Sequence, residues 1–230
     1  MKTKIYFKSI IAIAVFYVIA ITLRYLTNKT SLLSGVESEF LKIILQGISP
    51  AVGALIACIL FRIKMEMGLK GVFKNNLLPV LIYWIFPILL IGLIAYFTNK
   101  TILFVPILTI LIYGLLEEIG WRGFLWQLLK PLPKIAGILI IAVLWFIWHL
   151  NFELSNANLL FLGILLLGSW GIGLVADKTK SLLAVAAFHS LNNFFAALNI
   201  QEIIILVILM TVWILSIVYR RKFENNKTII

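Results

Sequence analysis

The sequence predicts an all-α, polytopic membrane protein with about eight transmembrane helices and both termini in the cytoplasm. Its composition is the first observation that supports this prediction: of 230 residues, 63% are hydrophobic and 13% are charged, and the mean hydropathy is +1.10. Soluble domains contain about 45–50% apolar and about 25% charged residues, so a soluble fold of this size could not bury so much apolar surface. The single cysteine, Cys58, excludes an internal disulfide framework.

Apolar runs long enough to cross a bilayer are the second observation. A helix needs about 20 apolar residues to span a hydrocarbon core of roughly 30 Å. The predicted spans are residues 7–25, 42–61, 77–97, 101–118, 135–151, 158–176, 182–200 and 202–219. No internal repeat and no soluble segment interrupts this series. We therefore expect one integral-membrane domain over residues 1–230, with its core motif region at residues 101–200.

The distribution of positive charge is the third observation. If the N-terminus is cytoplasmic, the alternating segments place sixteen of the twenty Lys and Arg residues inside. The other four, Arg24, Lys29, Lys42 and Lys100, lie outside. This asymmetry follows the positive-inside rule and supports eight spans with both ends inside. Because the basic residues are spread over loops, the net charge of +11 does not indicate binding of nucleic acid.

Two segments permit a second interpretation. The first span has basic residues, an apolar run and Val18-Ile19-Ala20, as a cleavable signal peptide would. Its length and the following Arg24 favour a retained helix. The segment 62–76 mixes basic and apolar side chains, which is compatible with an amphipathic helix lying in the membrane interface.

Ionisable side chains interrupt the apolar pattern in the second half of the chain. Each costs about 2.5–3.5 kcal/mol on insertion scales, so such residues within membrane spans are functional candidates. Both histidines of the protein belong to this group, and we expect nothing comparable in the first three spans. The group comprises Glu117, Glu118, Arg122, His149, His189, Asn192 and Asn193.

Helical spacing predicts how these side chains are arranged. Glu118 and Arg122 are four residues apart and can form an ion pair, and His189 and Asn193 share a face in the same way. Adjacent helical residues point about 100° apart. We therefore expect only one acidic residue of the pair, Glu117, to face the two histidines across the bundle.

Structural interpretations of the same residues also remain open. The acidic pair with Arg122 is compatible with a helix end in cytoplasmic water, His149 with an interfacial histidine, and His189 with hydrogen bonding between helices. Aromatic residues near the group are interpreted as membrane-belt anchors without a chemical role. They are Tyr113, Trp121, Trp126, Trp145 and Trp148.

Three motifs occur in order, each in its own predicted helix. Residues 117–122, Glu-Glu-Ile-Gly-Trp-Arg, have the form E-E-x-x-x-R, and residues 189–193, His-Ser-Leu-Asn-Asn, have the form H-x-x-x-N. Between them, residues 145–149, Trp-Phe-Ile-Trp-His, end in a histidine. The set resembles the CAAX protease and bacteriocin-processing (CPBP, or Abi) family of intramembrane proteases. The family's middle motif is F-x-x-x-H, so Trp145 is a departure that keeps an aromatic ring.

This resemblance implies hydrolysis of a peptide bond in a membrane-associated protein or peptide. It assigns Glu117 as the general base, His149 as a partner of the attacking water, and His189 with Asn193 as oxyanion donors. Glu118 paired with Arg122 would support them. These roles are chemically reasonable, because a desolvated carboxylate is a better base near neutral pH and because amide and imidazole N–H groups stabilise oxyanions. The substrates implied are CAAX proteins, bacteriocin leaders or other signal peptides.

The cofactor and two other functional classes stay open. Glu117, His149 and His189 also form a two-histidine, one-carboxylate set that suits Zn²⁺. The sequence has no H-E-x-x-H motif, so it does not require zinc. The alternatives are a non-catalytic bacteriocin self-immunity protein of the same fold and a small transporter, which the lack of a repeat disfavours. Ile-, Lys- and Asn-rich usage indicates a bacterial cell membrane.

Overall fold

The computed structural model describes residues 2–97, 104–194, 208 and 211, and most of these residues are helical. The one pairing of extended backbone in these residues is a single parallel bridge between Gly68 and Ser181. The predicted all-α class is therefore confirmed. The eighth predicted span, residues 202–219, lies outside the described residues except for two isolated positions.

The helices overlap each of the first seven predicted spans. By length and apolar character, α1 from Phe7 onward and α9 can each cross a bilayer, and α2 with α3 adds a third candidate if this pair, bent by 43°, is one span. The elements are α1 (Lys2–Lys29), η1 (Ser31–Leu33), α2 (Glu39–Gly47), α3 (Ser49–Phe61), α4 (Phe73–Val80), η2 (Leu81–Ile85), α5 (Phe86–Phe97), α6 (Phe104–Glu118), η3 (Ile119–Trp126), α7 (Gln127–Leu129), α8 (Lys134–Trp148), α9 (Asn156–Thr179) and α10 (Leu182–Phe194).

Local sequence accounts for several helix ends. The side chain of Ser38 accepts a hydrogen bond from the backbone of Leu41 at the start of α2, and Ser155 caps α9 in the same way. Pro50 occupies the first turn of α3, where the missing N–H of proline is tolerated but the preceding helix cannot continue unbroken. The α2–α3 bend therefore falls beside Pro50.

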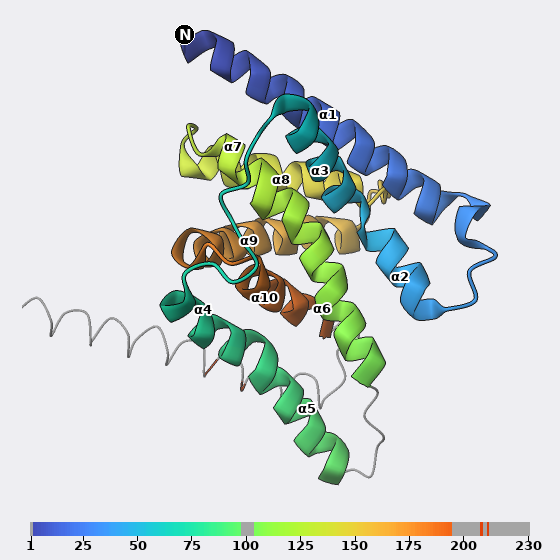
Figure 1. Ribbon diagram of the computed structural model, residues 1–230. Coiled ribbons are helices and arrows are strands. Elements are labelled where there is room, and N and C mark those ends of the chain that lie inside the picture. The colour runs from blue at the N-terminus through green and yellow to red at the C-terminus, as the bar shows by residue number, and fades with distance from the viewer. Residues whose placement is uncertain (1, 98–103, 195–207, 209–210, 212–230) are drawn as a thin grey trace, which may run out of the picture.

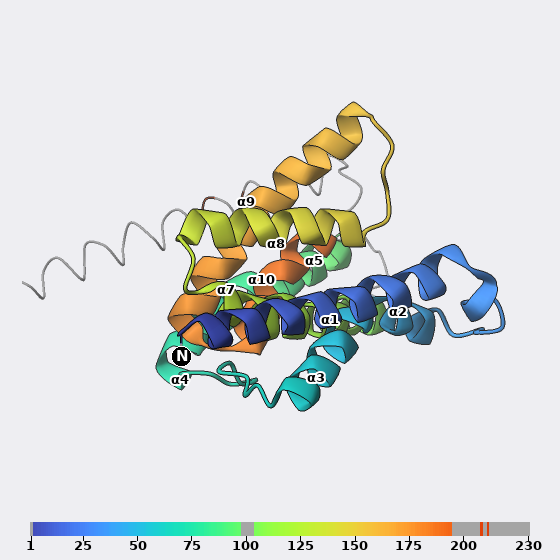
Figure 2. The same cartoon turned by 90° about the horizontal axis from the view of Figure 1, so that it is seen from above.

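One face of the N-terminal helix packs against the rest of the bundle through Ala12, Phe16 and Ala20. Figure 1 shows α1 along the top, α6 through the centre and α4 with α5 below, and Figure 2 shows α8 beside α9 from above. Phe16 of α1 is fully buried and packs edge-on against Trp121 of η3, with ring centroids 5.7 Å apart. Gly53 of α3 allows close contact, because a Cβ there would overlap the backbone of Phe16. The helices α1 and α3 thus support η3 from one side.

The segment between α3 and α4 is an extended strap, so the predicted interfacial helix over 62–76 is wrong; a helix begins only at Phe73. The strap binds the turn between α9 and α10: Val72 N donates to Thr179 O over 2.9 Å, and Leu182 N donates to Gly68 O over 2.9 Å. These partners occupy backbone groups that a helix would have paired internally. Gly71 has a φ of 54°, and a Cβ at this position would overlap the Thr179 carbonyl.

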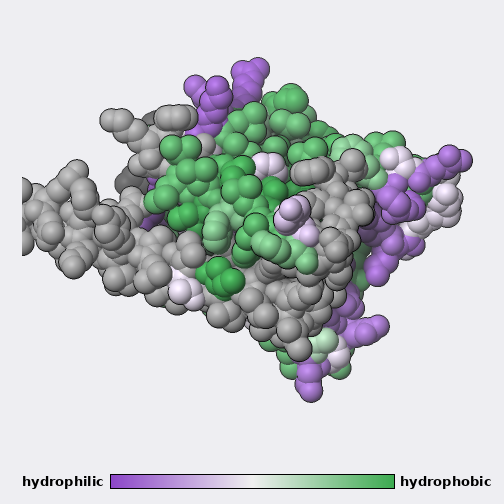
Figure 3. All heavy atoms as spheres, turned by 90° about the horizontal axis from the view of Figure 1, so that it is seen from below, coloured by the Kyte–Doolittle hydropathy of each residue, from purple (hydrophilic) through white to green (hydrophobic). Residues whose placement is uncertain are grey.

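The outer surface is rich in exposed apolar side chains, including Ile59, Leu60 and Leu139. Seen from below, the described atoms form a broad apolar surface with hydrophilic groups toward its margins (Figure 3). Broad exposed apolar surfaces are characteristic of regions that contact lipid or protein.

Candidate active site

The end of α6, the C-terminal turn of α8 and the middle of α10 meet inside the bundle. Four of the predicted side chains are buried there: Glu117 is 1% exposed, Glu118 and Arg122 are 0% exposed, and His189 is 4% exposed. Trp145 of α8 contacts two of them: it is hydrogen-bonded to Glu117, and its ring stands edge-on to His189. The interpretation of the acidic pair as a helix end in water is therefore wrong.

The Glu117 carboxylate is held by two neutral donors. Its Oε2 accepts a 2.8 Å hydrogen bond from Trp145 Nε1, and the hydroxyl of Tyr113, one turn earlier on α6, is also hydrogen-bonded to this side chain. The interpretation of these two aromatic residues as belt anchors is thus wrong. Their spacing was the available signal, because Tyr113 precedes Glu117 by four residues and Trp145 precedes His149 by four.

Glu118 forms two charge-assisted contacts through one oxygen. Oε1 accepts from Arg122 Nη1 over 3.0 Å, as the spacing predicts, and lies 2.7 Å from His189 Nδ1. The expectation that Glu118 points away from the histidines is wrong. The helix α10 packs along α6 at Gly114, where a Cβ would lie 3.7 Å from His189 Cγ, so the imidazole reaches the end of α6.

Arg122 balances the charge of this buried group. It lies in η3, a π-helical segment that continues α6, and its guanidinium carbon lies 4.9 Å from the centroid of the Trp145 ring. Its Nη1 binds Glu118. A cation above an aromatic face is attracted by the ring quadrupole. Arg122 therefore connects the Glu118 carboxylate to the indole that binds Glu117.

His149 caps the C-terminal end of α8 and is half-buried. Its Nδ1 lies 2.8 Å from the carbonyl oxygen of Trp145. Because a carbonyl only accepts, Nδ1 carries the hydrogen, and Nε2 of the neutral ring is left as an acceptor. The ring stands edge-on to Trp148 and Phe161, with centroids 5.1 and 4.8 Å away. Glu117 lies within electrostatic range of His149.

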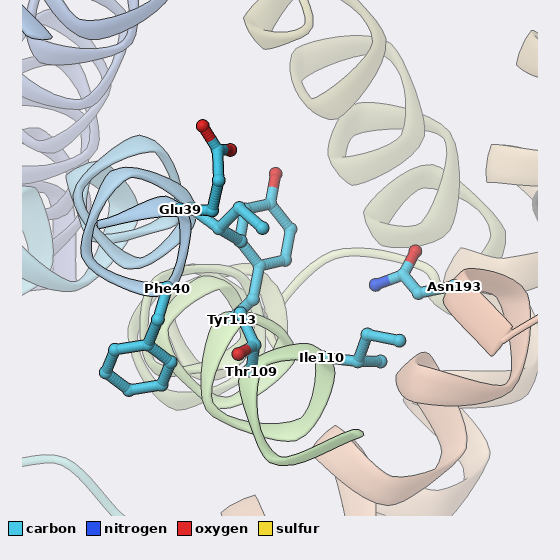
Figure 4. Close-up of a pocket in the computed structure, with 7 residues that line it drawn as sticks. Glu39, Phe40, Thr109, Ile110, Tyr113 and Asn193 are labelled. Carbon is cyan, nitrogen blue, oxygen red and sulfur yellow. The ribbon is translucent and has the colours of Figure 1, made fainter. Parts of the chain in front are cut away.

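Asn193 lies apart from the hydrogen-bonded group, at a cavity of about 510 Å³. Figure 4 shows Asn193 and Tyr113 on different sides of this space. Its lining is mainly apolar and comes from α2, α6 and α10: Glu39, Phe40, Ile43, Thr109, Ile110, Tyr113 and Asn193. Since Tyr113 also contacts Glu117, the cavity adjoins the buried carboxylate. The side chain of Asn192 is outside the described part.

The predicted zinc ligands do not form a metal site in this arrangement. Within the described residues, no group of three or more His, Cys, Asp or Glu side chains is placed to hold a metal ion. Glu117 is bound to Trp145, and His189 Nδ1 is bound to Glu118. A tetrahedral zinc site needs three protein donors around one point, and the described side chains are not placed in this way, so their arrangement does not fit a zinc ion.

Arg24 also belongs to this region, although its sequence position indicated only an external charge. Arg24 Nη1 donates to Gln46 O over 2.9 Å and lies 3.4 Å from Tyr113 Oη, and its guanidinium lies 4.1 Å above the Trp148 ring. The expectation that the first three spans contain no comparable ionisable residue is therefore wrong. A basic residue within the predicted span 7–25 was the available signal.

Membrane-length apolar helices packed around a buried cluster of ionisable side chains indicate an integral membrane protein. Residues 98–195 match the family model of Rce1-like type II CAAX prenyl endopeptidases, so the chain carries a domain of this family over these residues. The matched segment includes every residue of the three motifs. A comparison with curated proteins found no match.

Proposed function

We propose that the protein is a membrane-embedded endopeptidase that hydrolyses a peptide bond in a membrane-associated protein or peptide. The observation that carries this proposal is the buried Glu117 carboxylate, fixed by Trp145 and within electrostatic range of a half-buried histidine, in a segment that matches a peptidase family. A carboxylate fixed by neutral donors keeps its remaining lone pairs for a water molecule. The histidine, His149, offers Nε2 as a second acceptor.

The chemistry follows from these two acceptors. Glu117 removes a proton from water while His149 holds the other water hydrogen, and the water oxygen attacks the carbonyl carbon of the substrate. The carbonyl becomes a tetrahedral oxyanion. The proton on Glu117 then passes to the amide nitrogen, the C–N bond breaks, and an acid and an amine leave.

His189 and Asn193 are proposed as donors to the oxyanion. With Nδ1 bound to Glu118, the Nε2 atom of His189 is left for the substrate and donates when the ring is protonated. The Asn193 amide faces the cavity in which the substrate would lie (Figure 4). Donors fixed before the reaction stabilise developing charge without reorganisation. Glu118 orients His189, and Arg122 orients Glu118.

The substrate is proposed to be a lipid-modified CAAX-type terminus, because the matched family is described as prenyl endopeptidases. The test uses purified protein in liposomes and an internally quenched peptide with a farnesylated CAAX terminus, beside the same peptide without the lipid. We expect the lipidated peptide to be cleaved faster. Faster cleavage of the unmodified peptide contradicts the lipid preference, and cleavage of neither contradicts the proposed activity.

The role of Glu117 is tested by Glu117→Gln. The amide keeps the shape of the side chain but cannot take up a proton, so cleavage should fall to background while the protein stays folded. Glu118→Gln should retain measurable activity, because it changes a supporting group. Glu153→Gln, at an exposed loop position between α8 and α9, serves as the matched control and should behave as wild type. Full activity of Glu117→Gln contradicts its role as base.

We also propose eight spans in a bacterial cell membrane with both termini cytoplasmic, on the basis of the charge distribution and the composition. Reporter fusions at Asn99 and Lys180 should report opposite sides, outside and inside respectively. The same side for both positions would contradict this topology.

A further inference from the structure

Arg24 is a charged residue within α1, a helix that is long and apolar enough to span a membrane. It projects from α1 and contacts three other helices: the carbonyl of Gln46 at the end of α2, the hydroxyl of Tyr113 on α6, and the ring of Trp148 on α8. The helices α6 and α8 are the ones that present Glu117 and His149. Insertion of an arginine into a span is costly, so a group of contacts this specific indicates a role.

The hydrogen-bond directions at Tyr113 are fixed by chemistry. A guanidinium has donors only, so Tyr113 Oη must accept from Arg24 Nη1. The single hydrogen of the hydroxyl is then left for its other partner, the Glu117 carboxylate, which only accepts. Tyr113 therefore accepts from Arg24 and donates to Glu117, so the phenol links the cation to the carboxylate.

The packing of Tyr113 holds this chain of contacts in place. A Cβ at Gly47 would overlap the Tyr113 ring, so the ring lies directly against the end of α2. Gln46, the residue before this glycine, supplies the carbonyl that binds Arg24. The same contact between α2 and α6 thus fixes the phenol and its cationic partner.

We propose that Arg24 is a positioning residue for the peptidase reaction, acting through Tyr113 to hold the Glu117 carboxylate in the orientation that activates water. Trp145 fixes the carboxylate from α8, and the Arg24–Tyr113 pair fixes it from α1 and α6. Arg24 itself does not touch the reacting atoms. This inference rests on the proposed function, because it concerns the base of the same reaction.

The test is a double-mutant cycle with Arg24→Gln and Tyr113→Phe, assayed on the quenched farnesylated peptide. Each variant should lower kcat by about tenfold or more with KM within twofold, the size expected for loss of a hydrogen bond to a charged group. The kcat of the double variant should be no lower than that of the less active single variant, because both changes break one chain of contacts. Arg24→Lys should recover part of kcat, since it keeps a charged donor.

Two matched controls and the thermal unfolding midpoint separate positioning from general damage. Tyr25→Phe changes the exposed neighbour on α1, and Arg62→Gln changes an exposed arginine at the end of α3; both should keep wild-type kcat. If Arg24→Gln is not recovered folded, the cycle is run with Arg24→Lys. This change should lower kcat when Tyr113 is present and cause no further loss of kcat in the Tyr113→Phe background.

The outcomes distinguish the two proposals. An inactive wild type, or a fully active Glu117→Gln, overturns the proposed function. An active wild type whose Arg24→Gln variant keeps wild-type kcat overturns the inference alone. Losses that multiply in the double variant overturn it as well, because independent structural damage would give that result.

Discussion

The indole of Trp145 donates a 2.8 Å hydrogen bond to Glu117 while its ring covers the guanidinium of Arg122, whose carbon lies 4.9 Å from the ring centroid. The same ring stands edge-on to His189, with centroids 5.1 Å apart. One side chain therefore contacts the Glu117 carboxylate and both partners of the Glu118 carboxylate, Arg122 and His189. This arrangement lets two adjacent acidic residues have different partners in one buried space.

We expect Trp145→Phe to lower activity with little effect on folding. Phenylalanine keeps an aromatic ring beside His189 but removes the N–H that binds Glu117. A hydrogen bond to a charged group contributes about 1.5–3 kcal/mol, which corresponds to roughly a 10- to 150-fold loss of kcat/KM. Initial rates on the quenched peptide measure this loss. Trp170→Phe, a change at a half-exposed position on α9, is the control, and an equal loss there would contradict the specific role of Trp145.

Arg122→Ala and Asn193→Ala should separate support from chemistry. Removing Arg122 leaves the fully buried Glu118 without its cationic partner, and breaking a buried pair in this way costs about 3–5 kcal/mol. We therefore expect a lower folded yield and a lower thermal unfolding midpoint in detergent. Asn193 lies at the cavity, so its loss should reduce turnover by about 10²–10³-fold, as for other oxyanion donors, in a folded protein. Equal losses of yield would contradict this division.

Gly71→Ala should destabilise the strap between α3 and α4. Gly71 has a positive φ, and an added methyl group would overlap Thr179 O. Strain of this kind costs on the order of 1–3 kcal/mol. Gly68→Ala is the matched control in the same strap, because nothing lies within 4 Å of a Cβ at that position. The thermal unfolding midpoint should be lowered by Gly71→Ala and nearly unaffected by Gly68→Ala. The reverse order would contradict the close contact between Gly71 and Thr179.

Chelation should leave the peptidase activity unchanged. In the described part of the chain, the predicted ligands Glu117, His149 and His189 are not gathered into a group that could hold a metal ion. The measurement is the cleavage rate after treatment with a strong chelator and dialysis, with and without added Zn²⁺. Activity that is lost on chelation and restored by zinc would change the role of Glu117 from base to metal ligand.

Long apolar runs predict the helical class and the positions of the first seven spans, because lipid-facing and core residues of membrane helices are both apolar. The sequence also predicts the Glu118–Arg122 pair, since four-residue spacing determines which side chains meet within one helix. Contacts between helices are not encoded in this way. The meeting of Glu118 with His189 depends on how closely α10 approaches α6 at Gly114, and spacing along one helix contains no information about that distance.

Arg24 and the strap are two further features whose contacts could not be predicted from local sequence. Arg24 has its partners on α2, α6 and α8, far away in the sequence, so its charge was interpretable only as a topology signal. The strap 62–72 has amphipathic composition, but its hydrogen-bond partners lie in the turn between α9 and α10. Local pattern could not predict that tertiary pairing would replace a local helix.

The packing of one face of α1 on η3 has a consequence for how this protein can be divided. A fragment cut at the family-matched boundaries, residues 98–195, would retain all three motifs. It would lose Phe16, which packs on η3 at Trp121, and with it the arginine that reaches Tyr113. The three motifs therefore do not form a segment that would function without the N-terminal helices. Chimaeras that exchange only the N-terminal helices should differ in turnover even though every motif residue is identical.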